Sequence, residues 1–150
     1  MKGTIWFDMD GTIANLYAIP DWLPKLRASD PSPYAEAEVM LNMNQLAKLL
    51  HKVQAIGYTI GIISWLSKTG DESYDKAVTT AKKSWLNQHL HSVQFDFMHI
   101  VKYGTPKASF IRSTSDILFD DEDRHRTAWT GEAHTPNEIL ETLKALVEKG

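Results

Sequence analysis

The chain contains no cysteine in its 150 residues. This absence excludes disulfide bridges, zinc sites built on thiolates, and a cysteine nucleophile. The long apolar run of a signal peptide or a membrane span is also missing, since the N-terminus leads directly into a short strand-like stretch at 4–7. We therefore expect a cytoplasmic protein without a membrane partner.

The chain also has no large excess of positive or negative residues. Sixteen Lys and Arg residues oppose nineteen Asp and Glu residues, which gives a net charge of −3. This balance provides no general electrostatic reason to bind nucleic acid or an anionic membrane. The nearest approach to a basic cluster is Lys82-Lys83, which we interpret as a solvated helix face. Nucleic acid is therefore not an expected partner, and the sequence does not specify an oligomeric state.

Hydrophobic patterning predicts an α/β fold. Short apolar runs at 4–7, 58–63, 95–100 and 117–119 are expected to be strands. Apolar stripes at helical spacing are expected to be helices, and they are Met43-Leu46-Leu50-Val53, Tyr74-Val78-Ala81-Trp85 and Ile139-Leu143-Leu146. Gly57 supplies a stop after the first stripe, and Thr135 with Glu138 forms a capping box before the third. Residues 124–132 fit either a short helix with an edge strand or a continuous loop.

Strand–helix alternation of this kind is typical of a mainly parallel central sheet between two helical layers, a three-layer sandwich. The length of the chain fits a single domain covering 1–150. Residues 13–38 depart from the alternation. They contain four of the six prolines, and they greatly exceed the connection of about 2–6 residues that usually joins a strand to a helix. We expect this segment to form a small cap or lid after the first strand, with an irregular surface excursion as the alternative.

Acidic residues follow two of the predicted strands. Asp8 and Asp10 come directly after the strand at 4–7, with Gly11 next to turn the chain, and Asp120 and Asp121 follow the strand at 117–119. The ends of parallel strands meet at one edge of a sheet, where ligands bind. Two like charges about 5 Å apart repel by roughly 3 kcal/mol at an effective dielectric of 20. Such a cluster requires protons or a cation, and an oxygen-only site suits Mg²⁺. The alternative for either pair is an ordinary turn or helix cap.

Single polar residues are expected near the same edge. Ser64 follows the predicted strand at 58–63 and could donate its hydroxyl to a phosphate oxygen, although a serine at a strand end is often a simple cap. Lys107 could bring a compact positive charge into the acidic crevice, with a surface lysine as the alternative and Lys102 as a competing candidate. His125, a few residues past the acidic run, could also approach the site.

These pieces, in this order, resemble the motifs of the haloacid dehalogenase (HAD) superfamily. The motifs here are Asp8-x-Asp10-Gly11-Thr12, Ser64, Lys107 and Asp120-Asp121, and with the first strand they span residues 4–121. The resemblance implies a Rossmann-like fold. It also implies a phosphatase, because dehalogenase-like members of the family lack the second aspartate, Asp10.

The resemblance implies a role for each catalytic residue. Asp8 would attack phosphorus to give an aspartyl phosphate. Asp10 would protonate the leaving oxygen and then activate the water that hydrolyses the intermediate. The residues that would bind the phosphoryl oxygens are Ser64, Lys107, Gly11 and Thr12.

The resemblance also implies the ligands of a Mg²⁺ cofactor. They would be the Asp8 carboxylate, the Asp10 backbone carbonyl and one acid of the run at 120–123. Asp121 and Asp120 are the favoured candidates from this run, ahead of Asp123.

Aromatic residues suggest a substrate class. Tyr17, Trp22, Tyr34, Trp65 and Tyr103 lie in the insertion or beside the candidate phosphate-binding residues. Flat apolar faces can stack bases, and a small cap after the first motif resembles deoxyribonucleotidase-like members of the family. We expect a small phosphorylated metabolite as substrate, with a nucleoside monophosphate as the specific hypothesis. The alternatives are that most of these aromatics are core residues, and that the chain is a polynucleotide 3′-phosphatase or a non-catalytic HAD-like binding module.

Overall fold

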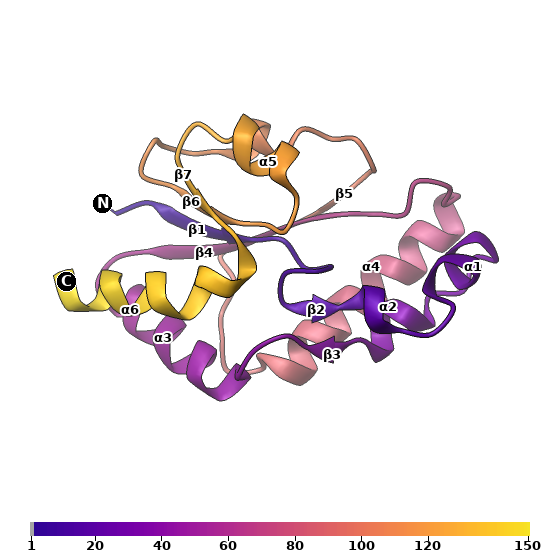
Figure 1. Cartoon of the computed structure of the whole chain (residues 1–150), viewed down its shortest axis with the longest axis horizontal. Coiled ribbons are helices and arrows are strands. Elements are labelled where there is room, and N and C mark those ends of the chain that lie inside the picture. The colour runs from indigo at the N-terminus through magenta and orange to yellow at the C-terminus, as the bar shows by residue number, and fades with distance from the viewer. Residues whose placement is uncertain (1) are drawn as a thin grey trace.

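A five-stranded parallel sheet forms the centre of the computed structural model, which describes residues 2–150 (Figure 1). Its strand order is β5-β4-β1-β6-β7, and every neighbouring pair is parallel. The strands are β1 (Thr4–Phe7), β4 (Thr59–Trp65), β5 (Phe97–Val101), β6 (Ile117–Phe119) and β7 (Glu132–His134). The predicted parallel sheet is therefore confirmed. β7 corresponds to the edge strand that was one of the two predictions for residues 124–132.

The second of these strands differs from its prediction in one respect that matters for the site. β4 continues to Trp65, beyond the expected run at 58–63, because its pairing with β5 extends as far as Trp65 opposite Val101. Ser64 therefore lies within β4, and it does not follow the strand as predicted. Its side chain is fully buried.

Helices lie on both faces of the sheet (Figure 1). The longer ones are α3 (Met43–Ala55), α4 (Glu72–His89) and α6 (Ile139–Lys149), and the short ones are α5 (Asp123–Ala128) and the 3₁₀ turns η2 (Lys107–Phe110) and η3 (Pro136–Glu138). After α3 the chain turns at Gly57, whose φ of 112° favours glycine. The predicted capping box is present, with the Thr135 N–H donating to the Glu138 carboxylate at 3.0 Å.

Alternating side chains of the strands build two apolar layers. Ile5 and Phe7 of β1 face α3 and α6, where they join a cluster that includes Leu50 and Leu143. Trp6 points to the other face, where the buried residues are Trp6, Ile63, Leu118 and Trp129 with η2 packed against them. This alternation confirms the three-layer arrangement.

Residues 13–38 fold into short elements that pack on α4. The elements are β2 (Ala14–Asn15), η1 (Leu16–Ala18), α1 (Trp22–Arg27), α2 (Ser32–Glu36) and β3 (Glu38–Val39), with β2 and β3 paired antiparallel. The Tyr74 hydroxyl donates to the Asp30 carbonyl at 3.0 Å, and the Trp85 Nε1–H donates to the Ala37 carbonyl at 2.7 Å. The segment is therefore an ordered layer joined to α4, rather than an irregular excursion.

Within residues 2–150, no helix has both the length and the apolar character that crossing a bilayer requires.

A buried carboxylate connects β1 to the turn before β6. Asp116 accepts hydrogen bonds from the Thr4 N–H at 2.8 Å, the Trp6 Nε1–H at 3.0 Å and the Arg112 N–H at 2.8 Å. Burial alone would raise the pKa of Asp116, but the Thr4 and Arg112 N–H donors outweigh it and hold the pKa below its ordinary value. The ionised form of Asp116 is thus part of the folded state.

Replacing Asp116 by alanine is expected to destabilise the fold. Each buried donor left without a partner costs about 1–3 kcal/mol, so we expect a loss of about 3 kcal/mol and a fall in Tm of roughly 6–12 °C. Because the folded-state pKa is depressed, the stabilisation is present above a pH of about 4 and is lost as the pH falls through the folded pKa. Thermal unfolding against pH should show the gap between wild type and Asp116→Ala narrowing in acid. The exposed acid variant Asp123→Ala is the matched control, and an equal loss in it would contradict this account.

Candidate active site

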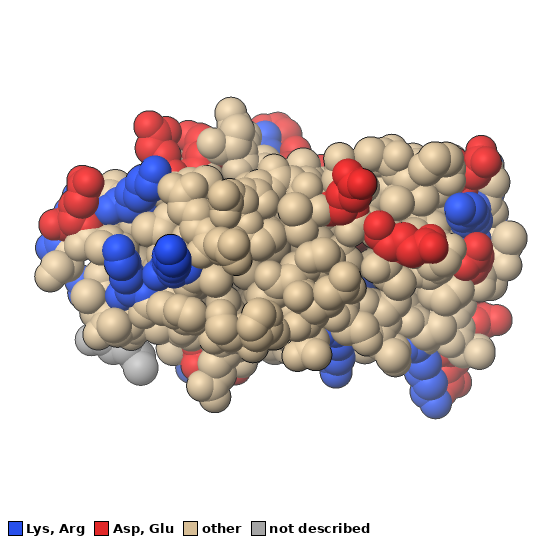
Figure 2. All heavy atoms as spheres, turned by 90° about the horizontal axis from the view of Figure 1, so that it is seen from below, with Lys and Arg blue, Asp and Glu red and all other residues tan. Residues whose placement is uncertain are grey.

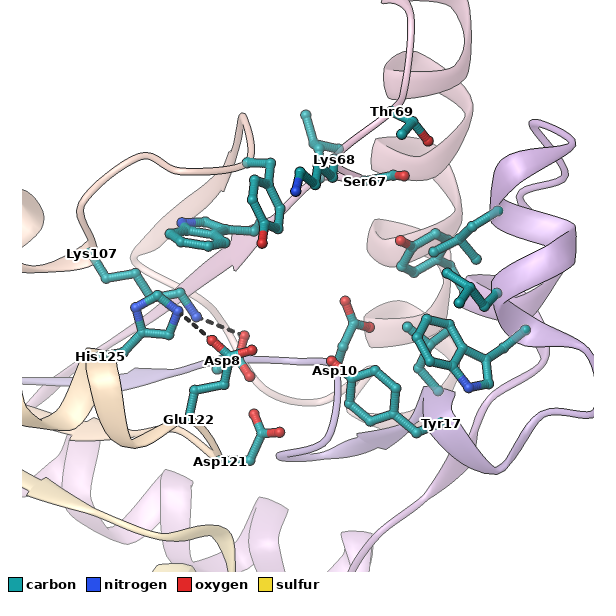
Figure 3. Close-up of a pocket in the computed structure, with 18 of the residues that line it drawn as sticks. Asp8, Asp10, Tyr17, Ser67, Lys68, Thr69, Lys107, Asp121, Glu122 and His125 are labelled. Carbon is teal, nitrogen blue, oxygen red and sulfur yellow. Dashed lines mark hydrogen bonds and ion pairs between the residues drawn. The ribbon is translucent and has the colours of Figure 1, made fainter.

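A buried lysine joins two of the predicted acids at the carboxyl edge of the sheet. Lys107 Nζ donates to Asp8 Oδ1 at 2.9 Å and to Asp120 Oδ2 at 2.7 Å (the first contact is dashed in Figure 3). Asp8 follows β1, Asp120 follows β6 and Lys107 opens η2, so three separate elements converge here. The competing candidate Lys102 is exposed on the surface. The structure thus selects Lys107, which is 4% exposed.

The turn after β1 supports Asp8 from the other side. The Thr12 hydroxyl donates to Asp8 Oδ2 at 2.9 Å. Gly11 has a φ of 80°, and a Cβ there would come within 2.4 Å of Asp121 Oδ2, so the close approach requires glycine. The amides of Gly11 and Thr12 bond to carbonyls of the same turn. In the part of the chain that the structure describes, these two residues therefore lie behind Asp8 and do not line the pocket in front of it.

The acids after β6 occupy different environments. Asp120 is fully buried, bonded to Lys107 through Oδ2 and to the Glu122 N–H through Oδ1. Asp121 lines the pocket, whereas Asp123 is exposed at the start of α5. The structure therefore separates the three candidates that the sequence could not, with Asp121 the acid open to the pocket.

Charge crowding makes this edge suitable for a divalent cation. Carboxylate oxygens of Asp8, Asp120 and Asp121 lie within 4.8 Å of one another. Burial and the neighbouring Asp8 charge raise the pKa of Asp120 to about 6 and that of Asp121 to about 8. Burial also acts on Asp8, but the Lys107 charge outweighs it and lowers the pKa of that carboxyl. Lys107 compensates only part of this charge, and an all-oxygen set of this kind fits Mg²⁺.

A second buried lysine contacts the other aspartate of the turn. Lys82 is 1% exposed, and its Nζ lies 2.9 Å from Asp10 Oδ2 and 2.6 Å from Ser64 Oγ. The interpretation of Lys82-Lys83 as a solvated face is therefore wrong for Lys82, although Lys83 is exposed. The stripe of α4 contained the signal, since Lys82 lies four residues after Val78 and three before Trp85. A charged residue at core spacing indicates a buried partner.

The pocket in front of these residues has a volume of about 340 Å³. Its walls come from residues 13–38 on one side, and from β4, the loop before η2 and α5 on the other (Figure 3). All five aromatics predicted near the site line it, namely Tyr17, Trp22, Tyr34, Trp65 and Tyr103. Tyr34 also belongs to the buried cluster on α4, whereas Tyr17 and Tyr103 are exposed. All five therefore border the pocket, although Tyr34 and Trp22 also pack in the buried cluster on α4.

Hydroxyl groups line the pocket, but the predicted hydroxyl, that of Ser64, is not among them. Ser64 does not line it, since its hydroxyl lies against Lys82. Ser67 and Thr69, in the loop after β4, do line it (Figure 3). Sequence reasoning missed them because a serine or threonine in a polar loop has no distinguishing neighbour.

Cationic side chains surround the aromatic wall. The Arg124 guanidinium lies 4.9 Å from the Trp65 ring centroid, and Lys68 Nζ lies 5.8 Å from that of Tyr103. His125 lines the pocket as its sequence position suggested, with Nε2 2.9 Å from Glu122 Oε2. Burial, together with the Lys107 charge, lowers the pKa of His125. Nothing in the sequence distinguished Lys68 or Arg124 from other surface cations.

Solved structures are similar to this chain in fold. D,D-heptose 1,7-bisphosphate phosphatase from Burkholderia thailandensis aligns with a TM-score of 0.57 and 11% identity, over 97% of this chain and 99% of that chain. The HAD domain of the effector protein Lem4 from Legionella pneumophila aligns with a TM-score of 0.43 and 15% identity, over 98% and 94%. No protein-family model matches the sequence, and no curated protein sequence does. The likeness to the phosphatase confirms the predicted Rossmann-like α/β fold.

Neutralising Asp121 is expected to stabilise the protein when divalent cations are removed. At a pH above the Asp121 pKa of about 8, Asp121→Asn removes one repelling charge and should raise the Tm measured in EDTA. Mg²⁺ should raise the Tm of wild type by mass action and have little effect on the variant. Asp123→Asn, an exposed acid of the same run, should behave as wild type. An Asp121→Asn protein that is less stable in EDTA and still gains stability from Mg²⁺ would refute this assignment.

Proposed function

We propose that this chain is a Mg²⁺-dependent phosphomonoester hydrolase that acts through a phosphoryl group on Asp8. The main support for the proposal is the Lys107 side chain, which hydrogen-bonds to both Asp8 and Asp120. Lys107 and Asp8 line the pocket together with Asp10 and Asp121. Sites of this composition serve phosphoryl transfer, in which positioning and charge compensation supply most of the catalysis.

Asp8 is the proposed nucleophile. Its carboxylate stays ionised because the Lys107 charge outweighs the effect of burial on the pKa. A carboxylate oxygen of Asp8 forms a bond to phosphorus as the bond from phosphorus to the ester oxygen breaks, giving an acyl phosphate and an alcohol. The ammonium of Lys107 remains beside the phosphoryl oxygens and compensates their charge.

Asp10 is the proposed acid and base. Burial, supported by the nearby Asp8 charge, raises the pKa of Asp10 above its ordinary value even though Lys82 opposes the shift. A raised pKa allows Asp10 to carry the proton that the leaving oxygen takes. The resulting carboxylate then accepts a proton from the water that attacks phosphorus, which releases phosphate and restores Asp8.

The chain offers oxygen ligands for a Mg²⁺ ion beside these groups. The Asp8 and Asp121 carboxylates and the Asp10 backbone carbonyl would hold it, with Asp120 behind them. When bound, the ion supplies positive charge that neutralises the phosphoryl oxygens. Ser64, bonded to Lys82, would support the phosphate-binding edge from behind, with the pocket hydroxyls of Ser67 and Thr69 nearer to a substrate.

A nucleoside monophosphate is the proposed substrate. The pocket combines an acidic floor with aromatic residues on both walls, and the guanidinium plane of Arg124 lies over Trp65. Bases stack on aromatic faces and on guanidinium planes. The heptose bisphosphate phosphatase acts on a phosphorylated sugar, so sugar phosphates are the competing class of substrate.

A polynucleotide 3′-phosphatase is the second candidate, and one observation favours it. Besides Lys107, three cationic residues line the pocket from different parts of the chain, namely Arg27, Lys68 and Arg124, and they could contact the backbone of a strand end. On the face shown in Figure 2, however, the basic side chains of the described residues gather at one end or stand singly, and they form no continuous band. Competition between a 3′-phosphorylated oligonucleotide and a mononucleotide distinguishes the two candidates.

Turnover is expected to depend on Asp8 and on Mg²⁺. Phosphate release from an aryl phosphate and from a panel of phosphorylated metabolites should be fast with Mg²⁺ and abolished by EDTA. Asp8→Asn should lower kcat by at least about 10³-fold, because the nucleophile is lost. The exposed variant Asp123→Asn is the control and should keep wild-type turnover. A wild type no faster than Asp8→Asn on every compound would reject the hydrolase and leave a binding module.

Removing an aromatic residue from the pocket wall is expected to weaken the binding of nucleotides selectively. Tyr103→Ala should raise the KM for a nucleoside monophosphate by about tenfold, since stacking on one aromatic side chain contributes about 1–3 kcal/mol. The KM for glycerol phosphate, which has no base, should stay within about twofold. Met40→Ala, an equally exposed apolar residue outside the pocket, is the control. If nucleotides are no better than sugar phosphates in wild type, the nucleotide assignment fails.

A further inference from the structure

The ammonium group of Lys82 makes three hydrogen bonds inside the protein. Besides Asp10 and Ser64, Nζ donates to the Trp65 carbonyl at 2.7 Å. A lysine has three N–H donors, so all of them are used inside the protein. The ammonium also lies 4.9 Å from the centroid of the Tyr34 ring, which comes from the segment at 13–38.

This position on α4 otherwise requires an apolar residue. Tyr74, Val78 and Trp85 of the same stripe are buried against the neighbouring layers. Burying an ammonium costs several kcal/mol unless a charged partner compensates it, and Asp10 is the carboxylate within ion-pair distance of Lys82 in residues 2–150. Helix packing alone therefore gives no reason for a lysine here, whereas holding Asp10 does.

We propose that Lys82 is a positioning residue for proton transfer by Asp10, an inference that rests on the proposed function. Lys82 holds Asp10 Oδ2, and this restricts rotation of the carboxyl group and directs Oδ1 toward the pocket, into which Asp10 projects (Figure 3). The other two hydrogen bonds of Lys82, to Ser64 and the Trp65 carbonyl, hold the lysine itself at the end of β4. Lys82 does not line the pocket and acts through Asp10.

Proton donation matters most for poor leaving groups, because a stable aryl oxide departs without a proton whereas an alkoxide does not. The ratio kcat/KM reports the reaction up to cleavage of the ester bond, and it excludes the later hydrolysis of the phosphoryl-enzyme. The dependence of kcat/KM on the leaving group therefore isolates the contribution of the acid.

The test measures kcat/KM for a series of aryl and alkyl phosphates that range from good to poor leaving groups. Lys82→Met should stay within about threefold of wild type on the best leaving group and fall about 100-fold on the poorest. Asp10→Asn should show the same steepened dependence, and the double variant should lose little more than Asp10→Asn alone. Lys83→Met, the exposed neighbour on α4, is the matched control and should keep the wild-type dependence.

Lys82→Gln is measured alongside, because it keeps a donor toward Asp10 and should fold if Lys82→Met does not. It should show an intermediate dependence on the leaving group. An equal loss on every ester, in whichever variant folds, would overturn the proposal and leave Lys82 a structural residue. A wild type without turnover on any ester would instead reject the proposed function, and this role with it.

Discussion

Two buried ammonium groups hold the carboxylates at the carboxyl edge of the sheet, and the rest of the site depends on this pairing. Lys107 lies between the residues that follow β1 and β6, and Lys82 lies between the β1 turn and the end of β4. Without Lys107, burial would drive Asp8 toward its neutral form, and without Lys82 the pKa of Asp10 would be raised further. The parallel order of the sheet brings these strand ends together, and the glycine turn at Gly11 allows their close approach.

The two ammonium groups also give the two aspartates of the turn different properties. Lys107 lowers the pKa of Asp8, whereas burial prevails over Lys82 and leaves the pKa of Asp10 raised. One carboxyl is thus suited to attack and the other to carry a proton, a separation of roles set by the environment of each. The segment at 13–38 completes the arrangement, because Tyr34 packs over Lys82 and, with other residues of the segment, lines one wall of the pocket.

The sequence predicted those features that local pattern determines. The strand at 117–119 coincides with β6, and the capping box before α6 and the turn at Gly57 are where the pattern placed them. It also predicted the convergence of Asp8, Lys107 and Asp120, because the ends of parallel strands meet. It missed the partner of Lys82, since burial depends on which helix face the sheet covers. The folded form of 13–38 was unpredictable for a similar reason, because these short elements are stabilised by packing on α4 rather than by their own propensities.

The most direct measurement is to trap the phosphoryl-enzyme during turnover. Wild type and Asp10→Asn would be mixed with an aryl phosphate and Mg²⁺, quenched in acid, digested and analysed by mass spectrometry. We expect a phosphoryl group on Asp8, sensitive to hydroxylamine as acyl phosphates are. It should accumulate further in Asp10→Asn, where the base for its hydrolysis is missing. A phosphoryl group on another residue, or none while phosphate is being released, would contradict the assignment of Asp8 as nucleophile.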